Sequence, residues 1–204
     1  TDSGWDWETA ILSTKAESED FTQNRLSNSL LQAGLADSTS NAINIFSSDV
    51  KTALAPAIVD VSRDDSSELN SFDFKASNPE IFSLPAGPVA MLLGFEYRKE
   101  EYSDDRDPRL DGTTRFTSIV TGLTSPFVGD VLGSSPTADT TGERETNSIF
   151  AEFILPLANN IESQIALRHE DPDDTDSSTV GKFALGWDVS QNFSLRGSFS
   201  TSFR

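Results

Sequence analysis

The sequence has no cysteine, a single histidine and little basic charge. Without cysteine, a disulfide framework or a thiolate metal site is excluded, and His169 alone cannot build a zinc site that needs three or four ligands. Lysine and arginine number 15 against 33 aspartates and glutamates, so the formal net charge is −18. This balance argues against binding a nucleic-acid backbone. It fits either a self-repelling, soluble surface or acidic loops that face a cation-rich exterior.

Long apolar runs are missing as well. Hydrophobic residues make up 36% of the chain and the mean hydropathy is −0.35, with no run near the roughly 20 residues that a transmembrane helix needs. A helical membrane protein is therefore excluded, whereas a transmembrane β-barrel is not, because its strands alternate between faces. The first residues, Thr1–Trp5, resemble no targeting signal. The last ones, Phe199–Arg204, have a strand-like pattern that stops without a turn, so we expect a piece excised from a longer chain.

Motifs for catalysis are weak or absent. No G-x-S-x-G elbow surrounds a serine, so His169 has no support as part of a catalytic triad. With 33 acidic residues some carboxylate pair is always available, and a glycosidase-like pair carries almost no information. Gly129, Gly133 and Gly142 are too sparse for a phosphate-binding loop. We therefore expect no enzymatic activity and no cofactor.

One acidic tract, Glu170–Asp176, has the clustered oxygen ligands that calcium favours. Its candidate calcium ligands are Asp171, Asp173, Asp174 and Asp176. The tract lacks the glycine and the terminal glutamate of an EF-hand loop, and a plain solvated loop is the alternative.

The feature that the chain does have is alternation with a period of two residues. One side of the final segment carries Phe193, Leu195, Gly197, Phe199, Thr201 and Phe203. The other side carries Ser194, Arg196, Ser198, Ser200, Ser202 and Arg204. A strand separates these two sets, whereas a helix would scatter them. Similar alternation marks residues 5–11, 72–76, 89–100, 150–155, 161–170 and 182–189. Phe150 is an exception, since it falls on the same side as Glu152. The pattern predicts about seven strands.

The connections between these strands alternate in length. Long polar segments cover about 18–65, 104–142 and 171–178, and short turns cover about 78–88, 157–160 and 190–192. In an antiparallel up-and-down β-meander every second connection lies at the same edge, so the long loops would share one side and the short turns the other. Transmembrane β-barrels have this asymmetry. The sequence thus predicts an all-β protein, with about seven strands of a transmembrane β-barrel.

The two longest loops differ in composition. In the first, four leucines at helical spacing predict a helix near Leu26–Leu35, and Asp49 can cap a short helical turn through Leu54. The second, 104–142, is rich in Gly, Ser, Thr and Pro, which predicts an irregular external loop.

The two faces of the predicted sheet suit a bilayer. The apolar face would meet lipid and the polar face an aqueous or plugged lumen. The lipid-facing set includes Trp5, Trp7, Tyr97, Trp187, Phe199 and Phe203. The lumen-facing set includes Glu96, Arg98, Glu152, Arg168, Lys182, Asp188 and Arg196. Alternation alone fits a soluble β-sandwich equally well, with the same apolar face as its core.

Several motifs carry a resemblance to one family. They are LPAGPV at 84–89, GFEYRKE at 94–100, IFAEFILPL at 149–157, ALRHED at 166–171 and LRGSFSTSFR at 195–204. In this order and spacing they resemble the barrel of TonB-dependent outer-membrane receptors. The resemblance covers most of residues 64–204 and, more loosely, residues 4–15.

This resemblance implies an internal portion of a Gram-negative barrel of about 22 strands. Such a receptor imports a scarce nutrient, such as a siderophore, cobalamin or an oligosaccharide, and is driven by TonB. The implied partners are the remainder of the barrel, its plug, TonB through that plug, a small nutrient ligand and outer-membrane lipid. The plug and the TonB box have no counterpart in this sequence.

Nine charged residues are the candidates for ligand binding or for lining the lumen. They are Glu96, Arg98, Arg106, Arg109, Arg115, Glu152, Arg168, Lys182 and Arg196. The three arginines of the second long loop could attract an anionic iron chelate or an acidic sugar. Alternatively they only offset Asp104, Asp105, Asp107 and Asp111. Because about seven strands leave two open edges, we expect the isolated chain to self-associate.

Overall fold

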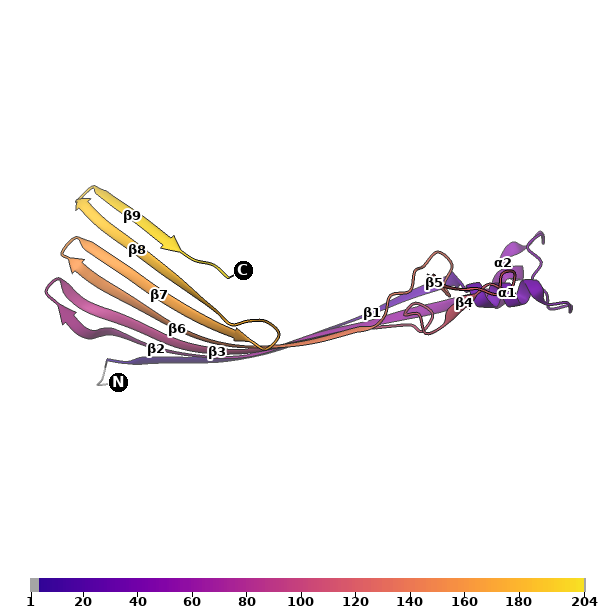
Figure 1. Cartoon of the computed structure of the whole chain (residues 1–204), viewed down its shortest axis with the longest axis horizontal. Helices are drawn as coiled ribbons and strands as arrows, with labels where there is room; N and C mark the ends of the chain where they lie inside the picture. Colours follow the sequence, from indigo (N-terminus) through magenta and orange to yellow (C-terminus); the bar gives the residue numbers. More distant parts are fainter. Residues whose placement is uncertain (1–3, 204) are drawn as a thin grey trace. The chain divides into compact units, whose positions relative to one another are not determined.

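The computed structural model describes residues 4–203, and its main feature is a seven-stranded antiparallel meander (Figure 1). Its strands, in order across the sheet, are β1 (Asp6–Leu26), β2 (Ile58–Leu84), β3 (Gly87–Arg106), β6 (Thr140–Ala158), β7 (Ile161–Pro172), β8 (Ser178–Ser190) and β9 (Phe193–Ser200). A separate two-stranded sheet is formed by β4 (Arg115–Thr117) and β5 (Thr124–Gly129). The predicted all-β, up-and-down fold is confirmed.

The strands are connected alternately by long and short segments. The short connections are residues 85–86, 159–160 and 191–192, and the longer ones are 27–57, 107–139 and 173–177. Several strands run further than the sequence predicts, because β1 continues to Leu26 and β2 already begins at Ile58. Nearly all side chains of β1 are exposed, so both of its faces can be polar and no alternation marks its full length.

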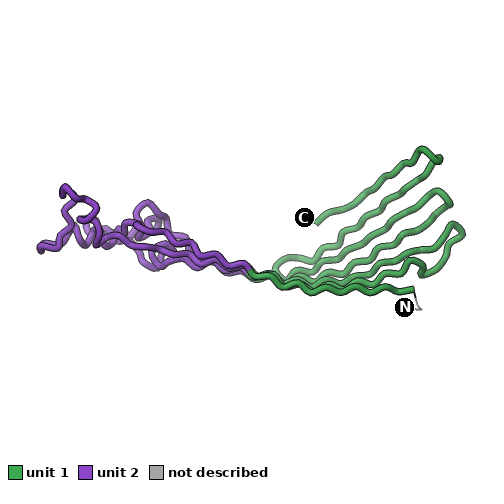
Figure 2. The backbone as a smooth tube through the Cα atoms, turned by 180° about the vertical axis from the view of Figure 1, so that it is seen from behind, with its two compact units in different colours: residues 1–15, 68–101, 143–204 green, residues 16–67, 102–142 purple. Residues whose placement is uncertain are grey.

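The chain divides into two compact units (Figure 2). Unit 1 comprises the described part of residues 1–15, together with 68–101 and 143–204. Unit 2 comprises residues 16–67 and 102–142. Strands β7, β8 and β9 lie wholly in unit 1, and the β4–β5 hairpin lies in unit 2.

In unit 1 the strands form a single layer (Figure 1). Its two faces differ in chemistry. The register from β6 to β9 places apolar residues in rows that cross the strands. We define the apolar face by two such rows, Phe153, Ile165, Phe183, Phe199 and Leu155, Ser163, Leu185, Gly197. The polar face has the alternate rows, Glu152, Ala166, Lys182, Ser200 and Pro156, Glu162, Gly186, Arg196. The predicted separation of the two sets is therefore a property of the whole sheet.

Phe150, which broke the alternation in the sequence, lies on the polar face, where the register pairs it with Arg168. Its ring occupies the space above Gly94 of β3, where an added Cβ would lie only 2.0 Å from the Phe150 Cζ atom. A glycine on one strand thus provides the room for an aromatic ring from another.

Unit 2 contains the helices. Helix α1 (Asn28–Ala36) is capped by Ser27, and α2 (Val50–Leu54) is capped by Asp49, before the short 3-10 helix η1 (Ala55–Ala57). Both predicted helices are confirmed. No helix within residues 4–203 is long and apolar enough to cross a membrane.

The second long loop is more ordered than its composition predicts. Strands β4 and β5 pair antiparallel, with Arg115 opposite Gly129 and Thr117 opposite Thr124. The prediction of an irregular loop over 104–142 was therefore wrong for this part. The hairpin escapes the alternation test because its first strand has three residues only, which is too short to show a period.

Candidate functional site

Arg168 is at the centre of a polar network on the polar face of unit 1. Its guanidinium Nη2 lies 3.2 Å from the Glu96 carboxylate and donates at 3.2 Å to the Ser148 hydroxyl. Its Nε lies 2.7 Å from Glu170. The guanidinium carbon also lies 5.5 Å from the centre of the Phe150 ring, a cation–π distance. Three strands, β3, β6 and β7, thus meet at one arginine.

The remaining charged residues of this face form fewer hydrogen bonds and ion pairs than Arg168. Gln164 donates to Glu152 at 2.5 Å, and Arg98 lies 3.6 Å from Glu100. Near the short connections the face is hollowed over about 540 Å³. Residues around this hollow include Pro156, Glu162, Gln164, Lys182, Asp188 and Arg196. Within residues 4–203, Lys182 and Arg196 form no ion pair, so the hollow offers two positive charges to a partner.

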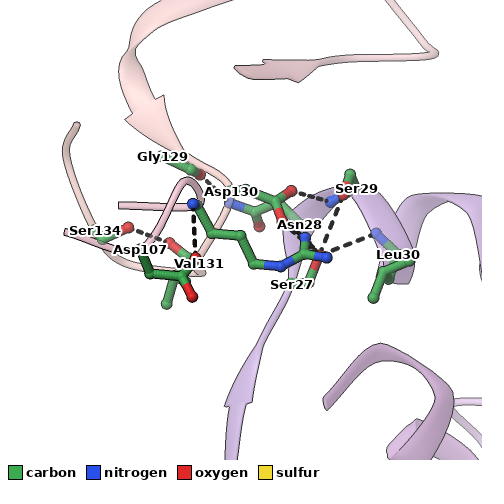
Figure 3. Close-up of polar contacts among 10 residues, drawn as sticks. Ser27, Asn28, Ser29, Leu30, Asp107, Gly129, Asp130, Val131 and Ser134 are labelled. Atoms are coloured by element: carbon green, nitrogen blue, oxygen red, sulfur yellow. Dashed lines mark hydrogen bonds and ion pairs between the residues drawn. The ribbon is translucent and has the colours of Figure 1, made fainter. Parts of the chain in front are cut away.

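In unit 2 the Asp130 carboxylate is a fully buried polar group (Figure 3). It accepts hydrogen bonds from the Ser27 hydroxyl at 2.7 Å and from the Ser29 backbone N–H at 2.9 Å, and it forms an ion pair with Arg109. Asp130 and Ser27 are both fully buried. Because Ser27 also accepts from the Leu30 N–H, two oxygen acceptors cap the first turn of α1.

The backbone reinforces this contact between the two long loops. The Asn28 N–H donates to the Asp130 carbonyl at 2.5 Å, and its side chain donates to the Gly129 carbonyl at 2.9 Å. Leu132 N–H donates to the Leu26 carbonyl at 2.8 Å. We call Ser27, Ser29, Arg109 and Asp130 the Asp130 cluster; it joins residues that are about a hundred positions apart in the sequence.

Opposing effects act on the pKa of Asp130. Burial raises this pKa, while hydrogen bonds from Ser29, Ser27 and Arg109 lower it by more, so the carboxyl titrates below its ordinary value of 3.8. Asp104 follows the same logic, since the Arg63 guanidinium holds the pKa of that carboxyl well below its usual range. Both carboxylates are therefore charged at neutral pH.

The loop arginines that were candidates for anion binding are mostly occupied. Arg106 lies 2.7 Å from Asp104, and Arg109 pairs with Asp130. Arg63, which the sequence did not single out, makes a bidentate contact with Asp104 at 2.8 and 2.9 Å. Arg115 alone of the three forms no ion pair within residues 4–203. The interpretation that these arginines offset aspartates fits the contacts of Arg106 and Arg109, and Arg115 remains a candidate for anion binding.

Comparison with known proteins gives one match. The family described as TonB dependent receptor-like, beta-barrel, matches residues 1–204. The chain belongs to the TonB-dependent receptor β-barrel family. No curated protein and no solved structure matches significantly.

Membership of this family places the site residues in context. The family is one of outer-membrane receptors and transporters rather than of enzymes. The nine candidates divide between the units: Arg106, Arg109 and Arg115 lie in unit 2 and the other six in unit 1. Among those six, the structure brings Arg168 to Glu96, and the register aligns Glu152 with Lys182 through Ala166.

The candidate calcium ligands and His169 make ordinary surface contacts. The four aspartates proposed for calcium are not gathered, and no group of three or more acidic or histidine side chains within residues 4–203 is placed to hold a metal ion. Asp173 instead accepts from the Glu145 N–H at 2.9 Å, and Asp174 lies 3.0 Å from Arg144. His169 bonds to the Thr179 hydroxyl at 2.8 Å, next to the apolar face.

The Asp130 cluster was missed by the sequence reasoning. An aspartate that follows an uncharged stretch, with serines at the start of a predicted helix, is the only indication of it. The contact between these two loops cannot be predicted from the sequence pattern, because the loops are far apart in the sequence and only the fold brings them together.

Proposed function

We propose that this chain forms part of the wall of an outer-membrane receptor that imports a scarce nutrient by TonB-driven transport. The observation that carries the proposal is the continuous apolar face of unit 1. Phe199 is 72% exposed and Leu167 57%, although both lie among other apolar side chains. Lipid chains would cover such a surface, and the polar face would then line the lumen.

The polar face supports the second half of this proposal. The Arg168 network stiffens the wall where three strands meet, and the hollow beside Lys182 and Arg196 leaves two cations unpaired. In a complete receptor a plug would fill the lumen, and an acidic segment of it would suit these cations. TonB would act through that plug. Siderophores, cobalamin and oligosaccharides are all compatible cargo for such a barrel.

A soluble β-rich binding or adhesion domain is the alternative. It would require a second layer over the apolar face, and within residues 4–203 the strands of unit 1 form one layer only (Figure 1). The lipid-facing arrangement therefore has the better support. Light scattering of the purified chain distinguishes the two, since a stable monomer without detergent would rule out a lipid-facing surface.

Uptake is tested in cells that make the receptor. Deleting the gene should abolish growth on one scarce nutrient, and a protonophore should abolish uptake of that nutrient while leaving surface binding intact, because TonB transmits the energy of the inner membrane. Normal growth of the deletion strain on every nutrient tested would contradict the proposal. A control strain lacking an unrelated porin should keep the energised uptake.

A further inference from the structure

Asp111 and Gly112 form the only Asp-Gly pair in the sequence, and they lie in the segment of unit 2 that connects β3 to β4. An aspartate that precedes a glycine is open to a backbone rearrangement. The glycine nitrogen can attack the side-chain carboxyl carbon of the aspartate, and glycine has no Cβ that hinders this attack. The conformation of the turn decides whether the two atoms come close.

The carboxylate of Asp111 is folded back over its own backbone. Its Oδ1 accepts from the Thr113 N–H at 2.5 Å, and its Oδ2 accepts from the Thr113 hydroxyl at 3.0 Å. Hydrogen bonds to the residue two positions further along close a ring that contains the nitrogen of the residue between. The carboxyl carbon is thus held next to the Gly112 nitrogen, and the two donors draw electron density away from this carbon.

The nitrogen that would attack is free. Within residues 4–203 the Gly112 N–H donates to no acceptor, so no hydrogen bond has to be given up when it reacts. The φ of Gly112 is +97°, a backbone conformation that residues with a Cβ rarely adopt. This turn therefore favours the residue type that leaves the nitrogen unhindered.

A second turn of unit 2 has the same contacts without the glycine. In Asp37-Ser38-Thr39, the aspartate Oδ1 accepts from the Thr39 N–H at 2.8 Å and its Oδ2 accepts from the Thr39 hydroxyl at 3.0 Å. The residue between is Ser38, whose Cβ lies beside the nitrogen that would attack. Comparing the two turns isolates the contribution of the glycine, because the carboxylate is held in the same way in both.

We propose that Asp111–Gly112 is a site of spontaneous isomerisation, at which the peptide bond passes from the main-chain carbon of the aspartate to its side chain. The Gly112 nitrogen first bonds to Cγ of Asp111. One carboxyl oxygen leaves as water with the amide proton and the carboxyl proton, and a five-membered cyclic imide remains. Water then adds to the main-chain carbonyl carbon of Asp111, and the bond from this carbon to the nitrogen breaks. The hydroxyl stays on the carbon and the proton goes to the nitrogen, so the composition of the chain is unchanged.

The product has a longer backbone and a displaced carboxylate. One carbon is added to the main chain beside Leu110, whose carbonyl accepts from the Thr137 N–H at 2.9 Å, and close in sequence to Arg109 of the Asp130 cluster. The new carboxylate is attached to Cα, so it no longer closes the ring to Thr113. We therefore expect the Thr113 amide to exchange its hydrogen faster in the isomerised receptor. This site does not depend on the proposed uptake function.

The test is peptide mapping of the whole receptor, purified in detergent and stored for several weeks. The peptide that contains Asp111 should separate into two forms of equal mass. The later-formed one should accept a methyl group from S-adenosylmethionine in the presence of an isoaspartyl methyltransferase. The same change at Asp37 should be about tenfold slower, which corresponds to a barrier higher by about 1.4 kcal/mol.

Two variants test the cause. Ser38→Gly gives the second turn an Asp-Gly pair, so isomerisation at Asp37 should become about tenfold faster, while Ser40→Gly, the same exchange outside the turn, should leave it unchanged. Asp111→Glu should abolish the reaction at its position, because a glutamate would have to close a six-membered ring.

Three results would overturn the inference. They are a single form of the Asp111 peptide after storage, equal rates at Asp111 and Asp37, and an unchanged rate at Asp37 in Ser38→Gly. A fourth is isomerisation at Asp111 that is faster in urea than in the folded receptor, since the turn would then protect the pair instead of promoting its reaction.

Discussion

Two serines of unit 1 are equally buried and have opposite surroundings. Ser148 and Ser163 are each 2% exposed. The Ser148 hydroxyl lies on the polar face and accepts from Arg168 at 3.2 Å. The Ser163 hydroxyl lies on the apolar face between Leu155 and Leu185, and within the described chain it has no hydrogen-bond partner. A buried hydroxyl without a partner costs about 1–3 kcal/mol.

Replacing these serines by alanine should therefore change stability in opposite directions. Ser163→Ala should leave the free energy of unfolding unchanged or raise it by up to about 1 kcal/mol, because it removes an unsatisfied group. Ser148→Ala should lower it by about 1 kcal/mol, since Arg168 loses an acceptor. Equilibrium urea unfolding of the receptor in lipid vesicles measures both. A larger loss for Ser163→Ala than for Ser148→Ala would contradict the assignment of the two faces.

Gly94 is required by the ring that covers it. Gly94→Ala would place a methyl group 2.0 Å from the Phe150 Cζ atom, so the ring must shift and the cation–π contact with Arg168 must loosen. Such overpacking should cost about 1–3 kcal/mol in the free energy of unfolding. Gly197→Ala is the control, because an added Cβ there meets nothing within 4 Å. If the double variant Gly94→Ala/Phe150→Ala were no more stable than Gly94→Ala, the steric explanation would be wrong.

At the scale of elements, one carboxylate connects α1 to the segment that follows β5. Asp130→Asn removes the charge that pairs with Arg109 and changes the acceptors at the start of α1. We expect the local opening of the first α1 turn to become easier by about 1–3 kcal/mol. Hydrogen exchange of the Ser29 and Leu30 amides reports it. Asp111→Asn is the control, since Asp111 bonds only within its own loop, to Thr113.

The same contact should depend on pH in a defined direction. Because the folded pKa of Asp130 lies below 3.8, its stabilisation is complete above that value and is lost as the pH falls further. Exchange of the α1 amides should therefore be constant from neutral pH to about 4, after correction for intrinsic rates, and accelerate below it. Asp130→Asn should flatten this acid-dependent part. An equal acid response in that variant would assign it to another carboxyl.

The elements that the sequence predicted well are those with a repeating pattern. The strands from β6 to β9 alternate between an apolar and a polar face, and α1 and α2 have leucine spacing and a capping aspartate as indications. The β4–β5 hairpin and the far end of β1 have no such pattern. Their order comes from backbone pairing and from single contacts such as Gln32 to Thr117, which no period in the sequence encodes.

At the scale of the whole molecule, the presence of a charged residue in the sequence does not show whether the fold leaves that charge without an ion pair. The sequence ranked Arg106, Arg109 and Arg168 together as candidates, yet the structure shows all three neutralised by carboxylates. Lys182 and Arg196, equally plain in the sequence, are the ones that form no ion pair within residues 4–203. Which cations remain available depends on which acidic side chains the fold brings near, and that is decided by strand register and loop contacts.

Two neighbouring residues of β7 provide the most direct test of the proposed membrane orientation of the sheet. Ile165 lies in the row with Phe153, Phe183 and Phe199, next to the other row of the apolar face. Ala166 lies on the polar face, in the row with Glu152 and Lys182.

If the apolar face meets hydrocarbon, Ile165→Lys should lower the free energy of unfolding in lipid vesicles by about 2–4 kcal/mol, the cost of a lysine near the bilayer midplane. Ala166→Lys, one position further, should cost well under 1 kcal/mol, because its ammonium group would lie between Glu152 and Lys182 in an aqueous lumen, where water screens both charges. Equal effects of the two substitutions would mean that the two faces do not meet different solvents, and the barrel arrangement proposed for this chain would have to be abandoned.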